Sequence, residues 1–139
     1  MKYLLDTNVI SELVAKQPLQ QVIDCLDNTD DNLIYLSVIT IGELKKGIER
    51  LPESMRKTAL RDWLTDELLL RFQGHILPLD TEVMLTWGVL TATLEQKERK
   101  LPVMDSLIAA IALRGQFVLV TRNEADFADT GVTILNPWK

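Results

Sequence analysis

The stretch Tyr3-Leu4-Leu5-Asp6-Thr7-Asn8-Val9-Ile10 places a carboxylate at the end of a short apolar run. Helix-like spacing of apolar residues begins directly after it and continues through Leu13 and Val14. In parallel-sheet proteins, functional groups lie where a strand stops and a helix begins. The same arrangement, an acid after or near a short apolar run, recurs at widely separated places in the chain.

The strands of the expected sheet are short apolar runs without clean alternation, which is typical of strands covered on both faces. Four such runs occupy residues 3–5, 33–36, 76–79 and 117–120, and residues 132–135 offer a fifth.

Helical patterns fill the gaps between these runs. A short one surrounds residues 22–26, and single apolar stripes at helical spacing follow at 60–68 and 83–94. Residues 107–113 are apolar nearly all round and predict a buried helix that ends at Gly115. Strands that alternate with helices predict an α/β sandwich with a mainly parallel sheet.

The composition fits one globular domain spanning residues 1–139, with 47% hydrophobic and 25% charged residues. The single Cys25 excludes an internal disulfide and a cysteine-rich zinc site. The single His75 argues against a histidine-based metal site. Any metal chemistry therefore has to use oxygen ligands, which suit Mg²⁺ or Mn²⁺.

Neither a targeting segment nor a membrane span is expected. The N-terminal apolar run ends after three residues at Asp6, and no apolar stretch is long enough to cross a bilayer. We therefore expect a soluble, cytoplasmic protein with no membrane partner.

The net charge of −5 is unusual for a nucleic-acid binder, although basic residues are clustered. The first cluster comprises Lys45, Lys46, Arg50, Arg56, Lys57 and Arg61, and the second comprises Lys97, Arg99 and Lys100. Each is interpreted as the solvated face of a helix.

Four acids, Asp6, Glu43, Asp105 and Asp126, each have a structural explanation as helix caps or first-turn acids. Residues 40–43 match a capping box, whereas an N-cap at Ser37 instead releases Glu43 from capping. Asp105 fits an N-cap, and Asp126 fits a first-turn acid behind a cap at Asn123.

The joint placement of these acids favours a different interpretation. The carboxyl ends of parallel strands share one edge of the sheet, so the four acids are expected to gather there. Such a cluster is unfavourable unless a cation neutralises it, and hard divalent cations suit carboxylates. Mg²⁺ or Mn²⁺ held in this way activates water for phosphodiester hydrolysis.

Four blocks of the chain resemble, in order, those of PIN-domain ribonucleases, and the resemblance extends from residue 5 to residue 127. The match is strongest with VapC-type toxins of bacterial toxin–antitoxin pairs, especially the FitB-like branch. The blocks are Leu5-Asp6-Thr7-Asn8, Gly42-Glu43-Leu44, Val103-Met104-Asp105-Ser106-Leu107-Ile108-Ala109 and Thr121-Arg122-Asn123-Glu124-Ala125-Asp126-Phe127.

The resemblance implies a PIN-like three-layer α/β/α sandwich and a metal-dependent endoribonuclease. Carried over, the metal-binding and catalytic acids are Asp6, Glu43 and Asp105, and Asp126 completes the quartet. Glu124 lies near Asp126, so the identity of the fourth acid stays open. Thr7 and Asn123 are expected beside the acids, where they bind the substrate phosphate or a metal-bound water.

The resemblance also implies partners. Members form homodimers and are held inactive in a heteromeric complex with a small antitoxin. The acidic net charge assigns DNA contact to the antitoxin. The stripe at Trp63, Leu64 and Leu68 offers either a groove for a partner helix or ordinary core packing. The alternative to an RNA-cleaving toxin is a non-catalytic PIN-like subunit that dimerises and binds a DNA-binding antitoxin to regulate an operon.

Overall fold

The computed structural model describes residues 1–139 and contains one sheet in which all neighbouring strands are parallel. Its strands are β1 (Tyr3–Leu5), β2 (Ile34–Ser37), β3 (Ile76–Leu77), β4 (Val118–Val120) and β5 (Ile134–Leu135), in the order β3-β2-β1-β4-β5. The predicted α/β class and all five strands are confirmed.

The strand order places a topological switch between β1 and β4. The chain moves outward from β1 through β2 to β3, then returns to pair β4 with the free side of β1. Leu5 lies opposite Val120 in this pair, and the Asp6 N–H donates to the Val120 carbonyl at 2.9 Å. Ligands of open parallel sheets bind beyond the carboxyl ends of strands at such a switch.

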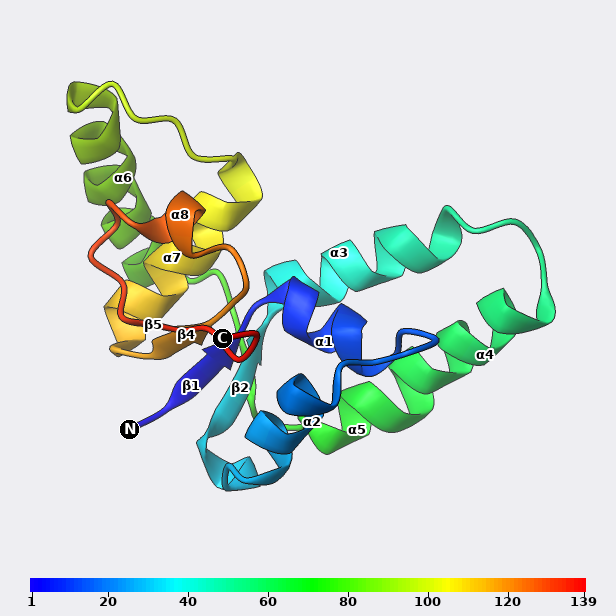
Figure 1. The fold of residues 1–139 in the computed structure, drawn as a ribbon. Coiled ribbons are helices and arrows are strands. Elements are labelled where there is room, and N and C mark those ends of the chain that lie inside the picture. Colours follow the sequence, from blue (N-terminus) through cyan, green and yellow to red (C-terminus); the bar gives the residue numbers. More distant parts are fainter.

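Helices cover both faces of the sheet (Figure 1), as a three-layer sandwich requires. They are α1 (Thr7–Leu13), α2 (Gln20–Asp27), α3 (Val38–Glu49), α4 (Met55–Trp63), α5 (Leu69–Arg71), α6 (Thr81–Gln96), α7 (Val103–Gly115) and α8 (Glu124–Phe127), with a 3₁₀ turn η1 (Asp31–Leu33) and a π-helical turn η2 (Leu64–Leu68).

Each face of the sheet has its own hydrophobic core. Leu4 and Leu119 pack with α6 and α7, whereas Leu5 and Val120 pack with the helices of the opposite face. Successive residues of a strand point to opposite faces, so three-residue strands contribute to both cores. Figure 1 shows α6 and α7 on one side and α1, α2 and α5 on the other. The burial of residues 106–112 confirms the predicted buried helix.

Local residues correct two predicted strand limits. The run at 33–36 pairs one residue later, because η1 occupies Leu33 after the Asp30 side chain accepts from the Asn32 N–H. The run at 76–79 ends as a strand at Leu77. Pro78 has no N–H to donate to a neighbouring strand, so the ladder ends there.

Gly115 does not end α7 in the way predicted. The left-handed residue that follows the helix is Gln116, with φ of 58°. Gly115 instead provides space, because a Cβ at this position would overlap the Phe117 ring. The glycine is therefore required by packing rather than by backbone conformation.

The stripe at residues 60–68 continues from α4 into η2. Leu64 and Leu68 are buried in the core shared with α1 and α3, so the core-packing alternative holds for both. Trp63 is half-buried against the same core and lines a groove of about 260 Å³.

No helix has the length and hydrophobicity of a bilayer-spanning segment.

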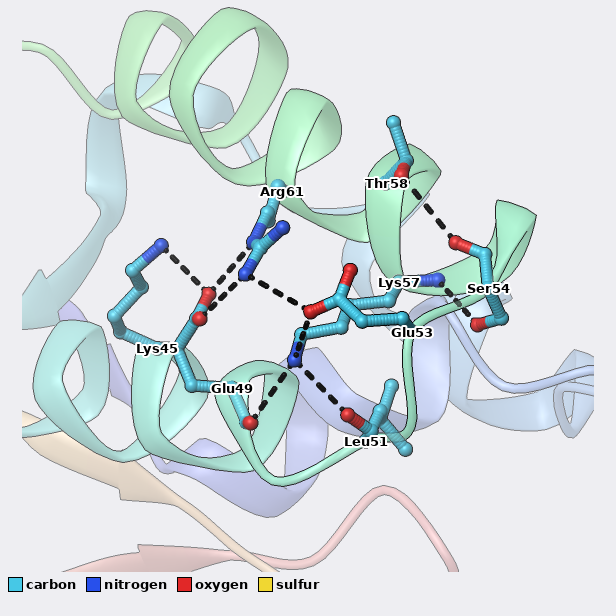
Figure 2. A network of polar contacts seen from close by, with 8 residues as sticks. All are labelled: Lys45, Glu49, Leu51, Glu53, Ser54, Lys57, Thr58 and Arg61. Carbon is cyan, nitrogen blue, oxygen red and sulfur yellow. Dashed lines mark hydrogen bonds and ion pairs between the residues drawn. The ribbon is translucent and has the colours of Figure 1, made fainter.

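Helices α3 and α4 form a projecting arm held by a network of charged side chains, shown in Figure 2. We call Lys45, Glu49, Glu53, Lys57 and Arg61 the arm network. Lys57 is only 6% exposed, so its interpretation as part of a solvated face is wrong. Its ammonium donates to the carbonyls of Glu49 at 3.2 Å and Leu51 at 3.0 Å, at the end of α3.

Each carboxylate of the arm network has a basic partner. Arg61 donates to both oxygens of Glu49 at 2.8 and 2.7 Å, and Lys45 adds a bond of 3.0 Å. Glu53 pairs with the Lys57 ammonium at 3.0 Å. Bonds from Arg61 and then Lys45 lower the pKa of Glu49 to about 2.

Candidate functional site

A polar cleft of about 490 Å³ opens beyond the carboxyl ends of β1 and β4, at the topological switch. Five of the six predicted site residues line it: Asp6, Thr7, Glu43, Asp105 and Asn123. Five further residues complete the lining: Asn8, Ser11, Glu12, Arg122 and Trp138. We call this the acidic cleft. Segments as far apart in sequence as Glu12 and Trp138, which are separated by 126 positions, therefore meet at one place.

Asp6 caps α1, as one interpretation of the sequence predicted, and also faces the cleft. One carboxylate oxygen accepts from the Thr7 N–H at 2.8 Å, and the other accepts from the Thr121 hydroxyl at 2.8 Å. The residue is only 4% exposed. Burial raises the pKa of Asp6, the two hydrogen bonds oppose this, and the charges of Glu43 and Asp126 raise it further.

Glu43 takes no part in capping, because Ser37 is the N-cap of α3 and accepts from the Thr40 N–H at 3.2 Å. The capping box predicted at residues 40–43 is therefore wrong. The Glu43 carboxylate instead accepts from the Thr7 hydroxyl at 2.6 Å. Thr7 is also bonded to the Thr40 hydroxyl at 3.0 Å, so it aims the Glu43 side chain from the start of α1.

Asp105 lies in the first turn of α7, and the N-cap position belongs to Pro102. The N-cap prediction for Asp105 is therefore wrong. Partial burial, followed by the charges of Asp6, Asp126 and Glu43, raises the pKa of Asp105 to about 6. The positive end of α7 favours a carboxylate here, yet burial and repulsion outweigh that attraction.

Asp126 affects the cleft without lining it. It is exposed on α8, and its charge raises the pKa of both Asp6 and Asp105. Arg99 holds α8 by donating to the Ala125 carbonyl at 2.5 Å. Glu124 is directed elsewhere, because its carboxylate is bonded to the Lys139 ammonium at 2.5 Å, which lowers its pKa.

Asn123 occupies the N-cap position of α8, but its side chain makes no capping bond. Its backbone N–H donates to the Thr121 hydroxyl at 3.1 Å, which leaves the side-chain amide at the cleft. Thr121 thus connects Asp6 on one side with Asn123 on the other.

Asn8, interpreted from the sequence as a helix-start residue, also belongs to the cleft. Its amide nitrogen donates to the Thr121 hydroxyl at 3.3 Å, and its buried Oδ1 accepts no hydrogen bond. A buried polar atom without a partner is unusual in a folded protein.

Arg122 and Trp138 were missed by sequence reasoning. Arg122 directly follows Thr121 after a predicted strand, and this position was the only signal available for it. The sequence held no signal for Trp138, because this residue lies beyond the last strand and reaches the cleft only when the chain folds. Its indole N–H donates to Glu12 on α1 at 3.3 Å.

The side chains around the cleft fit a hard divalent cation in chemistry and charge. The acidic side chains offer only oxygen ligands. Burial, followed by repulsion from neighbouring acids, raises the pKa of Asp105, and a cation relieves the repulsion. No three acidic, histidine or cysteine side chains are arranged as a ready ligand set. Mg²⁺ commonly uses only one or two protein carboxylates and keeps several waters, so a looser arrangement suits it.

Comparisons with known proteins agree with this geometry. A profile of the PIN domain matches residues 3–132. The VapC ribonuclease Y4jK of Sinorhizobium fredii is 34% identical over 136 residues, which cover 98% of this chain and 97% of that protein. Toxin FitB of Neisseria gonorrhoeae is 34% identical over 135 residues, which cover 97% of each.

A solved structure has the same fold over nearly the whole chain. The structure of FitAB bound to an IR36 DNA fragment matches with a TM-score of 0.94 and 32% identity, covering 99% of this chain and 96% of that chain. The predicted resemblance and the predicted three-layer fold are therefore confirmed.

Proposed function

Because the chain belongs to the PIN-domain family, we propose that it is an endoribonuclease toxin of a toxin–antitoxin pair that depends on Mg²⁺ or Mn²⁺. The observation that carries this proposal is the acidic cleft, where Asp6, Glu43 and Asp105 from three separate segments meet. Burial, followed by the charges of neighbouring acids, raises the pKa of Asp105 there. Relatives named as a ribonuclease and a toxin, each about a third identical over almost the whole chain, support it.

In this proposal Asp6, Glu43 and Asp105 hold the metal, and Asp126 supplies further negative charge. The pairing of Glu124 with Lys139 favours Asp126 as the fourth acid. When bound, the metal activates water and stabilises charge on the phosphodiester. The acids thereby form a site that attracts RNA phosphate only after the cation has neutralised them.

The surrounding residues set the orientation of the acids. Thr121 and the Thr7 N–H fix both oxygens of Asp6, and the Thr7 hydroxyl fixes Glu43. Thr7 therefore serves as a positioning residue as well as lying where the resemblance places a substrate contact. The free amide of Asn123 is directed to the substrate phosphate, and the unpartnered Asn8 oxygen accepts from a substrate hydroxyl or from water.

The partners in this proposal are RNA, a second copy of the chain and a cognate antitoxin that carries the DNA contacts. The groove beside Trp63 suits a segment of the antitoxin, because it is lined mostly by apolar residues and includes Glu43. A segment docked there reaches the acidic cleft, which Glu43 also lines. We place the toxin in the cytoplasm, where its RNA substrate is found.

Two assays test the proposed function. Purified protein is expected to cleave RNA in Mg²⁺ or Mn²⁺ and to stop when EDTA is added. Expression without the antitoxin is expected to arrest growth, and Asp6→Ala is expected to remove the arrest. Cleavage that persists in EDTA contradicts the metal mechanism. Absence of both cleavage and arrest favours the non-catalytic subunit that binds a DNA-binding antitoxin.

A separate measurement tests the metal site without relying on activity. Calorimetric titration with Mn²⁺ is expected to show binding that Asp105→Asn weakens by at least tenfold. Asp66→Asn, an exposed acid on η2 outside the cleft, is the matched control. Equal Mn²⁺ affinity in the two variants contradicts the assignment of Asp105.

A further inference from the structure

Arg122 is the only cation that lines the acidic cleft. It follows Thr121, whose hydroxyl is bonded to Asp6, so its backbone is anchored beside the central carboxylate. The side chain is exposed and makes no ion pair within the chain. A guanidinium surrounded by carboxylates that pairs with none of them needs an explanation.

The ring of Trp138 supplies that explanation. The Arg122 guanidinium lies over it, 5.6 Å from the ring centroid. Trp138 is itself held in place, because its indole N–H donates to Glu12 at 3.3 Å and its backbone N–H donates to Asn136 at 2.9 Å. The indole bond also engages Glu12, an acid that lines the same cleft.

The other arginines that contact acids show what Arg122 avoids. Arg61, Arg71 and Arg99 each lie within 3.4 Å of a carboxylate oxygen, so their charges are neutralised within the chain. Arg114 makes a longer ion pair with Glu82, at 3.9 Å. Stacking on an aromatic face holds a guanidinium in place while its N–H groups remain free to donate. The charge of Arg122 is therefore fixed in position and still available to a ligand.

We infer that Arg122 binds a phosphate of the RNA strand adjoining the scissile bond, and that Trp138 is the positioning residue that keeps it available. This inference rests on the proposed function and adds a specific substrate contact to it. A guanidinium fork matches two phosphate oxygens. It also gives the strand one attractive contact in a cleft whose other charged groups are all acids.

Salt dependence of binding tests the inference, because each phosphate contact on a single strand contributes about 0.7 to the slope of log affinity against log salt. A fluorescent single-stranded RNA is titrated over a range of salt with Asp105→Asn protein, in Mg²⁺ at a concentration that saturates the weakened metal site. Adding Arg122→Gln is expected to lower the slope by about 0.7 and to weaken binding roughly tenfold at low salt. Arg122→Lys is expected to keep the slope with lower affinity.

Control variants separate this contact from a general effect of charge or folding. Arg71→Gln removes an arginine outside the cleft and is expected to leave the slope unchanged. Trp138→Leu is expected to lower the slope as Arg122→Gln does, with no further fall in the double variant. Trp138→Phe keeps an aromatic ring beneath the guanidinium and is therefore expected to keep the salt slope of the parent protein. In otherwise wild-type protein, Arg122→Gln is expected to raise KM and leave kcat nearly unchanged.

The outcomes distinguish this inference from the proposed function. An unchanged slope for Arg122→Gln in protein that binds and cleaves RNA overturns the phosphate contact alone. Equal losses for Arg122→Gln and Arg71→Gln overturn it as well. If wild-type protein neither binds nor cleaves RNA, the proposed function fails and the inference fails with it.

Discussion

The acidic cleft and the arm network both gather charged side chains, but their carboxylates respond to folding in opposite ways. In the arm network the pKa of Glu49 falls to about 2, because Arg61 and Lys45 donate to it. In the cleft the pKa of Asp105 rises to about 6, because burial and neighbouring acids act without a compensating cation. Figure 2 shows the compensated case, in which each carboxylate has a basic partner.

This difference separates charge that serves folding from charge that serves a ligand. The network joins α3 to α4 and satisfies carbonyls where α3 ends. The cleft leaves Asp105 repelled by its neighbours, Asn8 with an unpartnered oxygen and Arg122 without an ion pair. Unfavourable electrostatics persist at functional sites because the ligand, and not the chain, relieves them.

The largest expected effect is on catalysis. Asp105→Asn is expected to reduce RNA cleavage in Mg²⁺ by on the order of 10²-fold or more, because a carboxylate that we propose as a metal ligand is lost. The same change is expected to leave the free energy of unfolding equal or higher in metal-free buffer, because it removes repulsion. The measurements are initial cleavage rates and urea unfolding in EDTA. If Asp105→Asn cleaves RNA normally, or if it is clearly destabilised, the cleft does not differ from the arm network as we propose.

The reverse pattern is expected for Lys57→Met in the arm network. Losing the charged hydrogen bonds to the Glu49 and Leu51 carbonyls is expected to lower the free energy of unfolding by about 2 kcal/mol. Cleavage per folded molecule is expected to stay within about twofold of wild type, because the network lies outside the cleft. Urea unfolding and cleavage at low temperature measure the two effects. Lys46→Met, an exposed lysine of α3, is the matched control.

The smallest effect is a dependence on pH with opposite sign in the two regions. The folded pKa of Asp105 lies above its ordinary value of 3.8, so folded protein binds the extra proton. Without metal, stability is therefore expected to rise as pH falls from about 6 toward 4. A rise of the pKa from 3.8 to about 6 corresponds to about 3 kcal/mol of stability, and screening at this partly exposed group reduces it to about 1 kcal/mol.

Glu49 has a lowered pKa and therefore contributes stability above its ordinary value of 4.5, which is lost as pH falls toward 2. The free energy of unfolding, measured in EDTA across this pH range, is expected to be highest between the pKa values of Asp105 and Glu49. Asp105→Asn is expected to reduce the pH dependence of stability between pH 6 and 4. Glu49→Gln is expected to reduce it below pH 4.5. Stability that falls steadily from pH 6 contradicts the assignment of repulsion to the cleft.

Local patterns sufficed for much of the fold because they depend on near neighbours. Apolar runs of three or four residues predicted the strands. Asp6 was predicted both at a strand end and as a helix cap. Predictions failed where a neighbour in space or an unnoticed local signal prevailed. Pro78 shortened β3, and the Phe117 ring explained Gly115. Of the two caps that the sequence offered for α3, the structure confirms Ser37.

The roles of charged residues depended still more on distant neighbours. Lys57 looked like one of several surface lysines and is buried against carbonyls. The resemblance placed Asp126 as the fourth acid and left Glu124 open, and the ion pair of Glu124 with Lys139 favours Asp126. Trp138 reaches the cleft because β5 returns the chain end to the side of β4.

By itself, the sequence determined the fold class, the strand positions and the residue types available to the site. These follow from hydrophobic periodicity and from motif order, which act over a few residues at a time. The tertiary structure decided which polar groups neutralise one another and which are left for a ligand. That division depends on distance and burial, since a charge is stabilised or strained by whatever lies within a few ångströms of it.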